Sequence, residues 1–120
     1  MNKNIVRLNV GLAIQAGKLD EFQKIAQDMT AVSENEPGTL GYDWYFSGNR
    51  ISCRLVESYV DGNALLAHFK GPAVQQLVPK MLENSSISSF EVYGDPGAEP
   101  TKMLAGFGAK IFLPWNRISR

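Results

Sequence analysis

The sequence predicts an α+β protein in which two helical regions cover one face of a four-stranded antiparallel sheet. Two observations support this fold class. Four segments of the 120-residue chain alternate apolar and polar side chains, as strands with differently covered faces do. Two further segments place apolar residues at helical spacing, and the six segments follow the order strand, helix, strand, strand, helix, strand. This order is that of the ferredoxin-like βαββαβ sandwich.

The first strand and the first helix have the clearest patterns. Residues Ile5 to Ile14 alternate. One face of this strand is apolar and the other is smaller and more polar. The apolar face consists of Val6, Leu8, Val10, Leu12 and Ile14, and the other of Arg7, Asn9, Gly11 and Ala13. Helical spacing extends from Lys18 to Asn35, with Asp20 and Glu21 where the helix dipole favours acidic side chains, and Pro37-Gly38 ends the helix.

The next segments predict a hairpin and a second helix. The strands Thr39 to Phe46 and Ile51 to Tyr59 are joined by Ser47 to Arg50, whose Gly-Asn pair we expect to adopt positive φ. Asp61 is a suitable N-cap for a helix that runs to about Lys70. We therefore expect the two strands to pair antiparallel and the helix to follow directly.

Gly71-Pro72 predicts an interruption of the second helical region. Pro72 can begin a further helical segment, whose apolar face consists of Val74, Leu77, Val78, Met81 and Leu82. We therefore expect no continuous helix from Asp61 to Glu83. The alternation of Ile87 to Tyr93 predicts the fourth strand.

The C-terminal residues, Gly94 to Arg120, extend beyond this core. A turn at Asp95-Pro96-Gly97 precedes a short helix expected around Thr101 to Ala105. Residues Ala109 to Leu113 are predicted to form an extended arm that pairs with the sheet edge of a second copy rather than folding back, with Trp115 as its anchor. The sheet face that the helices leave bare also needs cover, so we expect a homodimer with an isologous contact.

Composition and charge limit the functional classes. Twelve basic residues balance twelve acidic ones, which argues against nucleic-acid binding. No run of 18 apolar residues is present, so we expect no membrane partner. The apolar run near the N-terminus is interrupted by Asn9 and Gln15 and alternates as a strand rather than a signal peptide, so we expect a cytoplasmic protein. The length suits one domain over residues 1–120, with a core of about residues 4–95 and an arm over 96–120. Cys53 lies in an alternating apolar run and is expected to be a small buried thiol.

The sequence contains no complete motif for a metal or a cofactor. One histidine and one cysteine cannot supply a zinc ligand set. Gly106-Phe107-Gly108 lacks the third glycine of a dinucleotide-binding motif, and we interpret it as a turn before the arm. No Gly-x-Ser-x-Gly elbow or phosphate-binding loop is present either. We expect the protein to work without a cofactor.

Three pieces of the sequence together resemble a known family. They are Asn35-Glu36-Pro37-Gly38-Thr39-Leu40-Gly41-Tyr42-Asp43-Trp44-Tyr45, the stretch Val56 to Asp61, and Ala67-His68-Phe69. In this order they resemble the antibiotic biosynthesis monooxygenase family, over roughly Leu8 to Tyr93. The resemblance implies a ferredoxin-like domain that joins a second copy as a dimeric α/β barrel. The family is functionally mixed and holds cofactor-free monooxygenases, haem-degrading enzymes, isomerases and members with no assigned reaction.

His68 and Asn9 are the candidate catalytic residues. His68 lies at the flank of the apolar arc of its helix, the resemblance places it at the mouth of the barrel cavity, and a histidine acts as an acid or a base near neutral pH. The alternative is a structural or surface histidine. Asn9 can donate a hydrogen bond to a substrate oxygen if its strand face lines the barrel interior, with Arg7 as a reserve anion stabiliser. The alternative for Asn9 is contact with interfacial water or the partner chain.

Arg7 and three further side chains are candidates for substrate binding. Glu57 lies on a largely apolar strand face and needs a partner, and an ion pair across the dimer with Arg7 or Arg54 is the simpler interpretation. Tyr42 and Trp44 share a strand face, either as core or interface aromatics or as a flat wall for an aromatic ligand. We expect the partner's sheet to shelter this pocket from water.

The leading functional hypothesis is a cofactor-independent monooxygenase that acts on a phenolic or quinol-like small aromatic molecule with molecular oxygen. Such a substrate becomes electron-rich on deprotonation, so the protein needs only a base, hydrogen-bond donors and a dry aromatic pocket. Haem degradation is disfavoured because Val78 stands near the position of the ligating histidine in the haem-degrading members. The alternatives are a non-catalytic dimeric small-molecule-binding or stress-associated module and a small-metabolite isomerase that uses His68.

Overall fold

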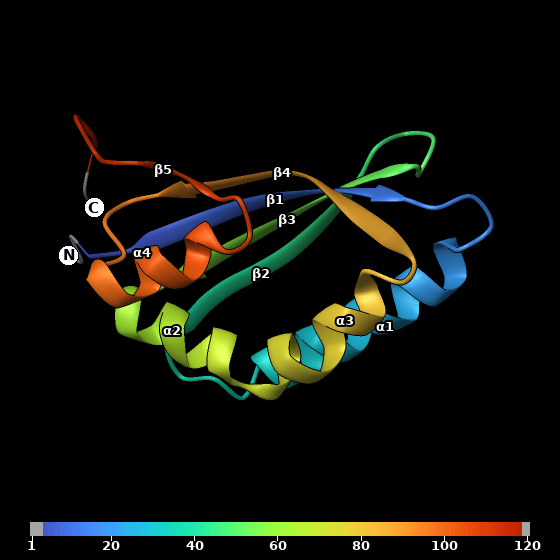
Figure 1. The fold of residues 1–120 in the computed structure, drawn as a ribbon, viewed down its shortest axis with the longest axis horizontal. Coiled ribbons are helices and arrows are strands. Elements are labelled where there is room, and N and C mark those ends of the chain that lie inside the picture. Colours follow the sequence, from blue (N-terminus) through green and yellow to red (C-terminus); the bar gives the residue numbers. More distant parts are fainter. Residues whose placement is uncertain (1–3, 119–120) are drawn as a thin grey trace.

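The computed structural model describes residues 4–118. Five strands form one sheet in the order β2-β3-β1-β4-β5, and the helices lie on one face of it (Figure 1). The elements are β1 (Val6–Ile14), α1 (Leu19–Ser33), β2 (Thr39–Phe46), β3 (Ser52–Tyr59), α2 (Gly62–Lys70), η1 (Ala73–Leu77), α3 (Val78–Met81), β4 (Ser85–Tyr93), α4 (Ala98–Ala105) and β5 (Lys110–Phe112). The predicted α+β ferredoxin-like fold is confirmed.

Alternation along the strands decides which side chains are buried beneath the helices. In β1, Leu8 is fully buried whereas its neighbour Arg7 is exposed. Leu8 lies opposite Glu57 of β3, and directly opposed residues of an antiparallel pair point to the same face, so Glu57 also faces the helices. We call the other side of the sheet the open face. It carries Arg7 and Asn9 of β1, Arg54 of β3 and Glu91 of β4.

Helix α1 supplies much of the apolar cover. Its buried side chains recur at helical spacing and are Phe22, Ile25, Ala26, Met29 and Ser33. Asp20 and Glu21 occupy its first turn, as predicted. Ser33 ends the helix with its hydroxyl donated to the carbonyl of Met29 at 2.8 Å, so a polar side chain is accommodated in the core without an unpaired group.

The second helical region is interrupted where the sequence predicted. The Asp61 carboxylate accepts a hydrogen bond from the backbone N–H of Ala64 at 2.9 Å, which caps α2, and the helix ends at Lys70 before Gly71-Pro72. The next turn, η1, is a π-helix. Pro79 accounts for it, because a proline has no N–H to donate to the carbonyl four residues back and its ring displaces that carbonyl.

The hairpin between β2 and β3 differs from expectation in one detail. The residue with positive φ is Arg50, at 59°, and not the Gly48-Asn49 pair. A turn from Ser47 to Arg50 is closed by a backbone hydrogen bond of 2.9 Å, and the Asn49 side chain accepts from the Ser47 hydroxyl at 2.8 Å. The side chain of Asn49 therefore stabilises the turn, and the left-handed position passes to the following residue.

The C-terminal segment corrects two expectations. Strand β5 pairs in parallel with β4 of the same chain, so the arm folds back onto its own sheet and the five-stranded sheet is mixed rather than wholly antiparallel. Helix α4 begins at Ala98, earlier than predicted, and packs beside α2 (Figure 1). Gly62 permits this approach, because a Cβ there would lie 1.8 Å from the carbonyl oxygen of Pro96. Ala109 and Ile111 thus pack within the chain, which the sequence pattern did not reveal, whereas Leu113 and the expected anchor Trp115 are exposed.

The sheet of the single chain is open, with β2 and β5 at its edges. Within residues 4–118, no helix is both long enough and apolar enough to cross a membrane.

Candidate active site

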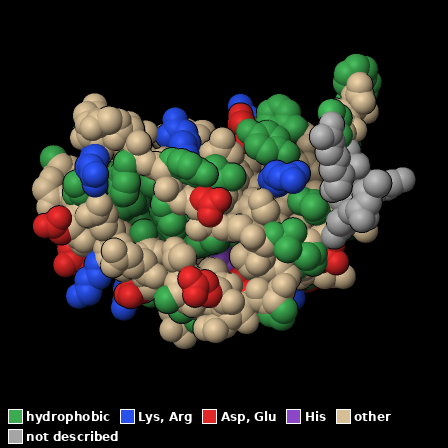
Figure 2. Space-filling view, turned by 180° about the vertical axis from the view of Figure 1, so that it is seen from behind, with side chains coloured by type: hydrophobic (Ala, Val, Ile, Leu, Met, Phe, Trp, Pro, Cys, Tyr) green, Lys and Arg blue, Asp and Glu red, His purple; other side chains and the backbone are tan. Residues whose placement is uncertain are grey.

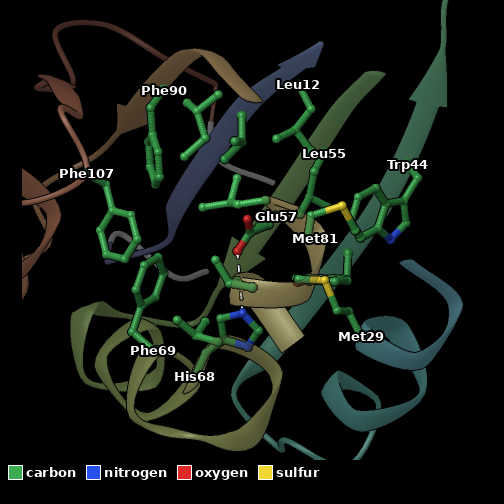
Figure 3. Close-up of a pocket in the computed structure, with 16 residues that line it drawn as sticks. Leu12, Met29, Trp44, Leu55, Glu57, His68, Phe69, Met81, Phe90 and Phe107 are labelled. Carbon is green, nitrogen blue, oxygen red and sulfur yellow. Dashed lines mark ion pairs between the residues drawn. The ribbon is translucent and has the colours of Figure 1, made fainter. Parts of the chain in front are cut away.

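A cavity of about 60 Å³ lies between the helices and the sheet. Its walls are mostly apolar and include leucine, methionine, valine and phenylalanine side chains, with Glu57, His68 and Tyr42 as the ionisable groups. Glu57 and His68 lie close together in it (Figure 3). An apolar pocket with a few convergent polar groups is the usual form of a small-molecule site. The residues that line it come from the helices and from the sheet of the same chain. That a partner's sheet shelters the pocket from water stays a prediction.

His68 projects from α2 into this cavity and is almost completely buried. Aromatic rings surround its imidazole, with centroid distances of 5.3 Å to Tyr42, 5.4 Å to Tyr59 and 5.7 Å to Phe69. Figure 2 shows the histidine only as a small area at the bottom of an opening in the molecular surface. Packing against these three rings therefore fixes the orientation of the imidazole.

Two carboxylates lie on either side of the imidazole. Nδ1 of His68 is 2.8 Å from Oε1 of Glu36, and Nε2 is 3.8 Å from Oε1 of Glu57. Glu36 also accepts a hydrogen bond from the Thr39 hydroxyl at 2.7 Å, which fixes its carboxylate. A carboxylate at Nδ1 favours the tautomer with its proton on that nitrogen, and Nε2 is then free to accept a proton on the cavity side.

Glu57 is a carboxyl group in a dry environment. Burial raises its pKa above the ordinary value, and the nearby imidazole and the hydrogen bond donated by Tyr59 oppose this only in part. The raised pKa favours the protonated acid, which can donate a hydrogen bond. The hydroxyls of Tyr42 and Tyr59 stay neutral, because burial and the adjacent Glu57 raise the pKa of both.

The two carboxylates differ in their access to water. The side chain of Glu36 is 22% exposed, whereas those of Glu57 and His68 are 5% and 1% exposed. Glu36 therefore lies on the solvent side of the imidazole, and Glu57 lies on its interior side. A proton taken up by Nε2 from a molecule in the cavity is stabilised by the carboxylate at Nδ1, in the way that an acid–base triad works.

The aromatic side of the pocket is also held in place. Tyr42 and Trp44 of β2 both line the cavity, and their ring centroids lie 5.8 Å apart with nearly perpendicular planes. The indole N–H of Trp44 donates a hydrogen bond to the Thr30 hydroxyl of α1 at 2.8 Å. Tyr42 and Trp44, which we predicted as a wall for an aromatic ligand, are thus held in place by these contacts.

Four of the six predicted site residues come together and two do not. His68, Glu57, Tyr42 and Trp44 line the same cavity. Asn9 and Arg7 lie on the open face, on the other side of the sheet from His68.

Glu57 is not paired with an arginine. Leu55 and Tyr59 share the buried face of β3 with Glu57, whereas Arg54 and Arg7 point to the open face. The expected ion pair of Glu57 with either arginine is therefore wrong, and the partners of this carboxyl group are His68 and Tyr59.

The sequence interpretation gave no role to Glu36 or Tyr59. Glu36 was visible as part of the Glu-Pro-Gly turn, but its partner in α2 lies 32 residues away in the chain, and sequence spacing gives no sign of such a contact. Tyr59 shares the strand face of Glu57 two residues earlier, so the same alternation that buried Glu57 could have identified its hydroxyl as a partner.

Within residues 4–118, no group of three or more histidine, cysteine or acidic side chains is arranged to hold a metal ion. Cys53 is buried, as predicted, and burial raises the pKa of its thiol to about 11.

Comparison with known proteins places this arrangement in a family. The family model described as antibiotic biosynthesis monooxygenase matches residues 5–80, which include Glu36, Glu57 and His68. The chain belongs to this family. The family resemblance noted in the sequence is thereby confirmed, and a monooxygenase-like activity is the general function that membership supports. No curated protein matches the sequence.

Solved structures share the fold. MupZ from Pseudomonas fluorescens is 23% identical, with a TM-score of 0.83 and coverage of 98% of this chain and 95% of that one. A "conserved protein of unknown function" and "possible oxidoreductase" from Bacteroides thetaiotaomicron VPI-5482 is 25% identical, with a TM-score of 0.69 and coverage of 75% and 96%. A "putative antibiotic biosynthesis monooxygenase" from Caulobacter crescentus CB15 is 22% identical, with a TM-score of 0.68 and coverage of 82% and 93%.

Proposed function

We propose that this member of the antibiotic biosynthesis monooxygenase family is a cofactor-independent monooxygenase that acts on a small phenolic or quinol-like molecule. The observation that carries the proposal is the Glu36–His68–Glu57 array at the ionisable end of an otherwise apolar cavity. An apolar aromatic ring with one ionisable hydroxyl is complementary to this arrangement.

The reaction balances without an external reductant. A phenol with a free ring position reacts with one molecule of oxygen to give a quinone and water. One oxygen atom enters the ring, the other leaves as water, and the substrate supplies all four electrons. The phenol must first become a phenolate, because the anion gives up one electron to triplet oxygen far more readily than the neutral molecule does. The radical pair then combines and a peroxide forms on the ring. The C–H bond at the same carbon then breaks, its electron pair forms the second carbonyl as the O–O bond breaks, and the proton leaves with the outer oxygen as water.

The protein's part in this scheme is acid–base chemistry. His68 takes the hydroxyl proton at Nε2, and the Glu36 carboxylate stabilises the imidazolium that results. Burial raises the pKa of Glu57 and so favours the acid form, which donates a hydrogen bond to the developing phenolate or peroxide and supplies one of the two protons that leave as water. His68 then returns its proton to Glu57 across the 3.8 Å between them.

Asn9 has no role in this scheme. The sequence suggested it as a hydrogen-bond donor to the substrate, but its side chain lies on the open face. Glu57 takes over that task in the proposal, since it lines the cavity 3.8 Å from Nε2 of His68.

A small-metabolite isomerase is the second candidate, and one observation favours it. A base and a protonated acid 3.8 Å apart can remove a proton at one carbon of a substrate and return a proton at another. This reaction consumes no oxygen, which separates it from the first proposal by a simple measurement.

We further propose that the protein works as a homodimer through the open face. Support comes from exposed apolar side chains on the open face and in the C-terminal residues beyond β5, among them Tyr45, Tyr93, Leu113 and Trp115. Sedimentation at micromolar concentration tests it, and a compact monomer would contradict it.

The functional experiment is oxygen uptake with a panel of phenols, hydroquinones and naphthols. Replacing His68 by alanine is expected to lower turnover by roughly 10²- to 10⁴-fold, because it removes the general base. Lys24→Ala, at an exposed position of α1 away from the open face, is the control and should keep wild-type turnover. Undiminished uptake by His68→Ala would exclude the mechanism, and substrate conversion without uptake would favour the isomerase.

A further inference from the structure

The Gly106-Phe107-Gly108 turn has a role that its sequence did not suggest. It follows α4 directly, and backbone hydrogen bonds of 3.0 Å from Phe107 to Leu104 and 3.1 Å from Gly108 to Ala105 close it. Gly108 has φ of +74°, a conformation that favours glycine. The turn is therefore well defined, and it fixes where the backbone of Phe107 lies relative to α4.

The Phe107 side chain lines the cavity. Its ring centroid is 5.4 Å from that of Phe69 and 6.0 Å from that of Phe90, and both of these residues also line the cavity. Figure 3 shows the three phenylalanines together on one side, Trp44 on the opposite side, and Glu57 and His68 between them. Phe107 therefore belongs to the wall that limits the cavity on the side away from Trp44.

The opposing walls differ in how readily they can move. Met29 and Met81 line the cavity near Trp44, and unbranched thioether side chains adapt easily to a ligand. Phe107 follows a hydrogen-bonded backbone turn, and its ring packs against two neighbouring rings, so its position is better defined than that of the methionines. A cavity of about 60 Å³ is also small, since an engineered cavity that binds benzene measures roughly 150 Å³.

Phe107 lies outside the part of the chain that defines the family. The family model ends at residue 80, whereas α4 and the following turn lie beyond it. Phe107 and Phe90 therefore form a part of this wall that lies beyond the family match, whereas Phe69 lies within it.

We propose that Phe107 determines specificity by limiting the size of the aromatic ligand, so that the chain accepts single-ring phenols or quinols and rejects two-ring ones. The inference rests on the proposed function in one respect, that the cavity is the substrate site. Replacing Phe107 by alanine removes a ring of six carbon atoms from the wall and leaves space for the second ring of a naphthol.

The test is calorimetric binding of hydroquinone and of a naphthol to the full-length protein without oxygen. Phe107→Ala is expected to increase naphthol affinity relative to hydroquinone by at least about tenfold, as ring-sized changes in an apolar pocket do. Phe112→Ala is the matched control, because Phe112 lies in the same segment, is 47% exposed and does not line the cavity. Its affinity ratio should equal that of the wild type.

Two further variants make the test independent of folding. Phe107→Leu keeps an apolar contact with a smaller side chain, and it replaces the alanine variant in the test if that variant unfolds. Phe107→Trp enlarges the side chain and should weaken hydroquinone binding. An unchanged affinity ratio in a folded Phe107 variant would overturn the proposal, as would a failure of both probes to bind. The binding assay excludes oxygen and is therefore independent of turnover. If the affinity ratio shifts but the separate uptake experiment shows no oxygen consumption, the role of Phe107 is sustained and the monooxygenase is rejected.

Discussion

The two faces of the sheet carry ionisable side chains in opposite ways. Beneath the helices, Glu57 and His68 are buried within a few ångströms of each other, and burial raises the pKa of the carboxyl group. On the open face, Arg7 and Arg54 extend into solvent. The same strands thus create a dry site on one side and a solvated surface on the other, and burial on the dry side favours the protonated form of Glu57.

The largest expected effect is on stability, where substitutions of two adjacent residues on opposite faces should differ strongly. Leu8 is fully buried and Arg7 is exposed. Leu8→Ala should lower the free energy of unfolding by about 2–5 kcal/mol. Arg7→Ala should change it by about 0.5 kcal/mol or less if the open face is solvated. Urea unfolding measures both changes. A loss of stability in Arg7→Ala that depends on protein concentration would indicate that a second copy covers this face.

The second prediction concerns the partner of Nδ1. Glu36→Gln should lower turnover by roughly 10²-fold, because a neutral amide stabilises the imidazolium less and does not select the tautomer. Glu34→Gln, two residues earlier and exposed, is the control. Equal turnover in the two variants would show that Glu36 only holds the fold together.

The third prediction is a smaller, pH-dependent effect on stability. The raised pKa of Glu57 means that the folded state keeps a proton that the unfolded chain loses above the ordinary value of 4.5. Stability of the wild type should therefore fall as pH rises from that value through the folded-state pKa. Glu57→Gln does not titrate, so its stability relative to the wild type should rise with pH, by at most about 1.4 kcal/mol per pH unit.

Glu83→Gln is the matched control for this measurement, because Glu83 is exposed. Urea unfolding of the three proteins between about pH 4.5 and about pH 8 gives the comparison. A relative stability of Glu57→Gln that is flat or falls with pH would show that Glu57 is ionised in the folded protein.

Local patterns allowed much of the fold to be predicted from the sequence. Alternation in β1 separated Leu8 from Arg7, and Gly71-Pro72 marked the interruption of the helical region. The C-terminal arm was predicted as extended but was assigned the wrong partner, because an apolar strand does not encode which edge it will pair with.

The candidate site was predictable where a residue's own strand face decided its place. Tyr42 and Trp44 followed from alternation, and the same rule applied to Glu57 would have excluded its arginine partners. Glu36 and Phe107 were not predictable, since each reaches its partners through tertiary contacts that have no local signature. Asn9 was nominated on the condition that its face lined a cavity, and the cavity lies on the other face.

The central claim is that the buried face removes a proton from a bound hydroxyl. Binding of para-nitrophenol without oxygen tests it most directly, because the phenol and its phenolate have different absorbance spectra. The account predicts that the wild type binds this probe as the phenolate at a pH below the probe's own pKa, and that His68→Ala binds it as the neutral phenol. A neutral phenol in the wild type, or the same phenolate spectrum in His68→Ala, would contradict the account.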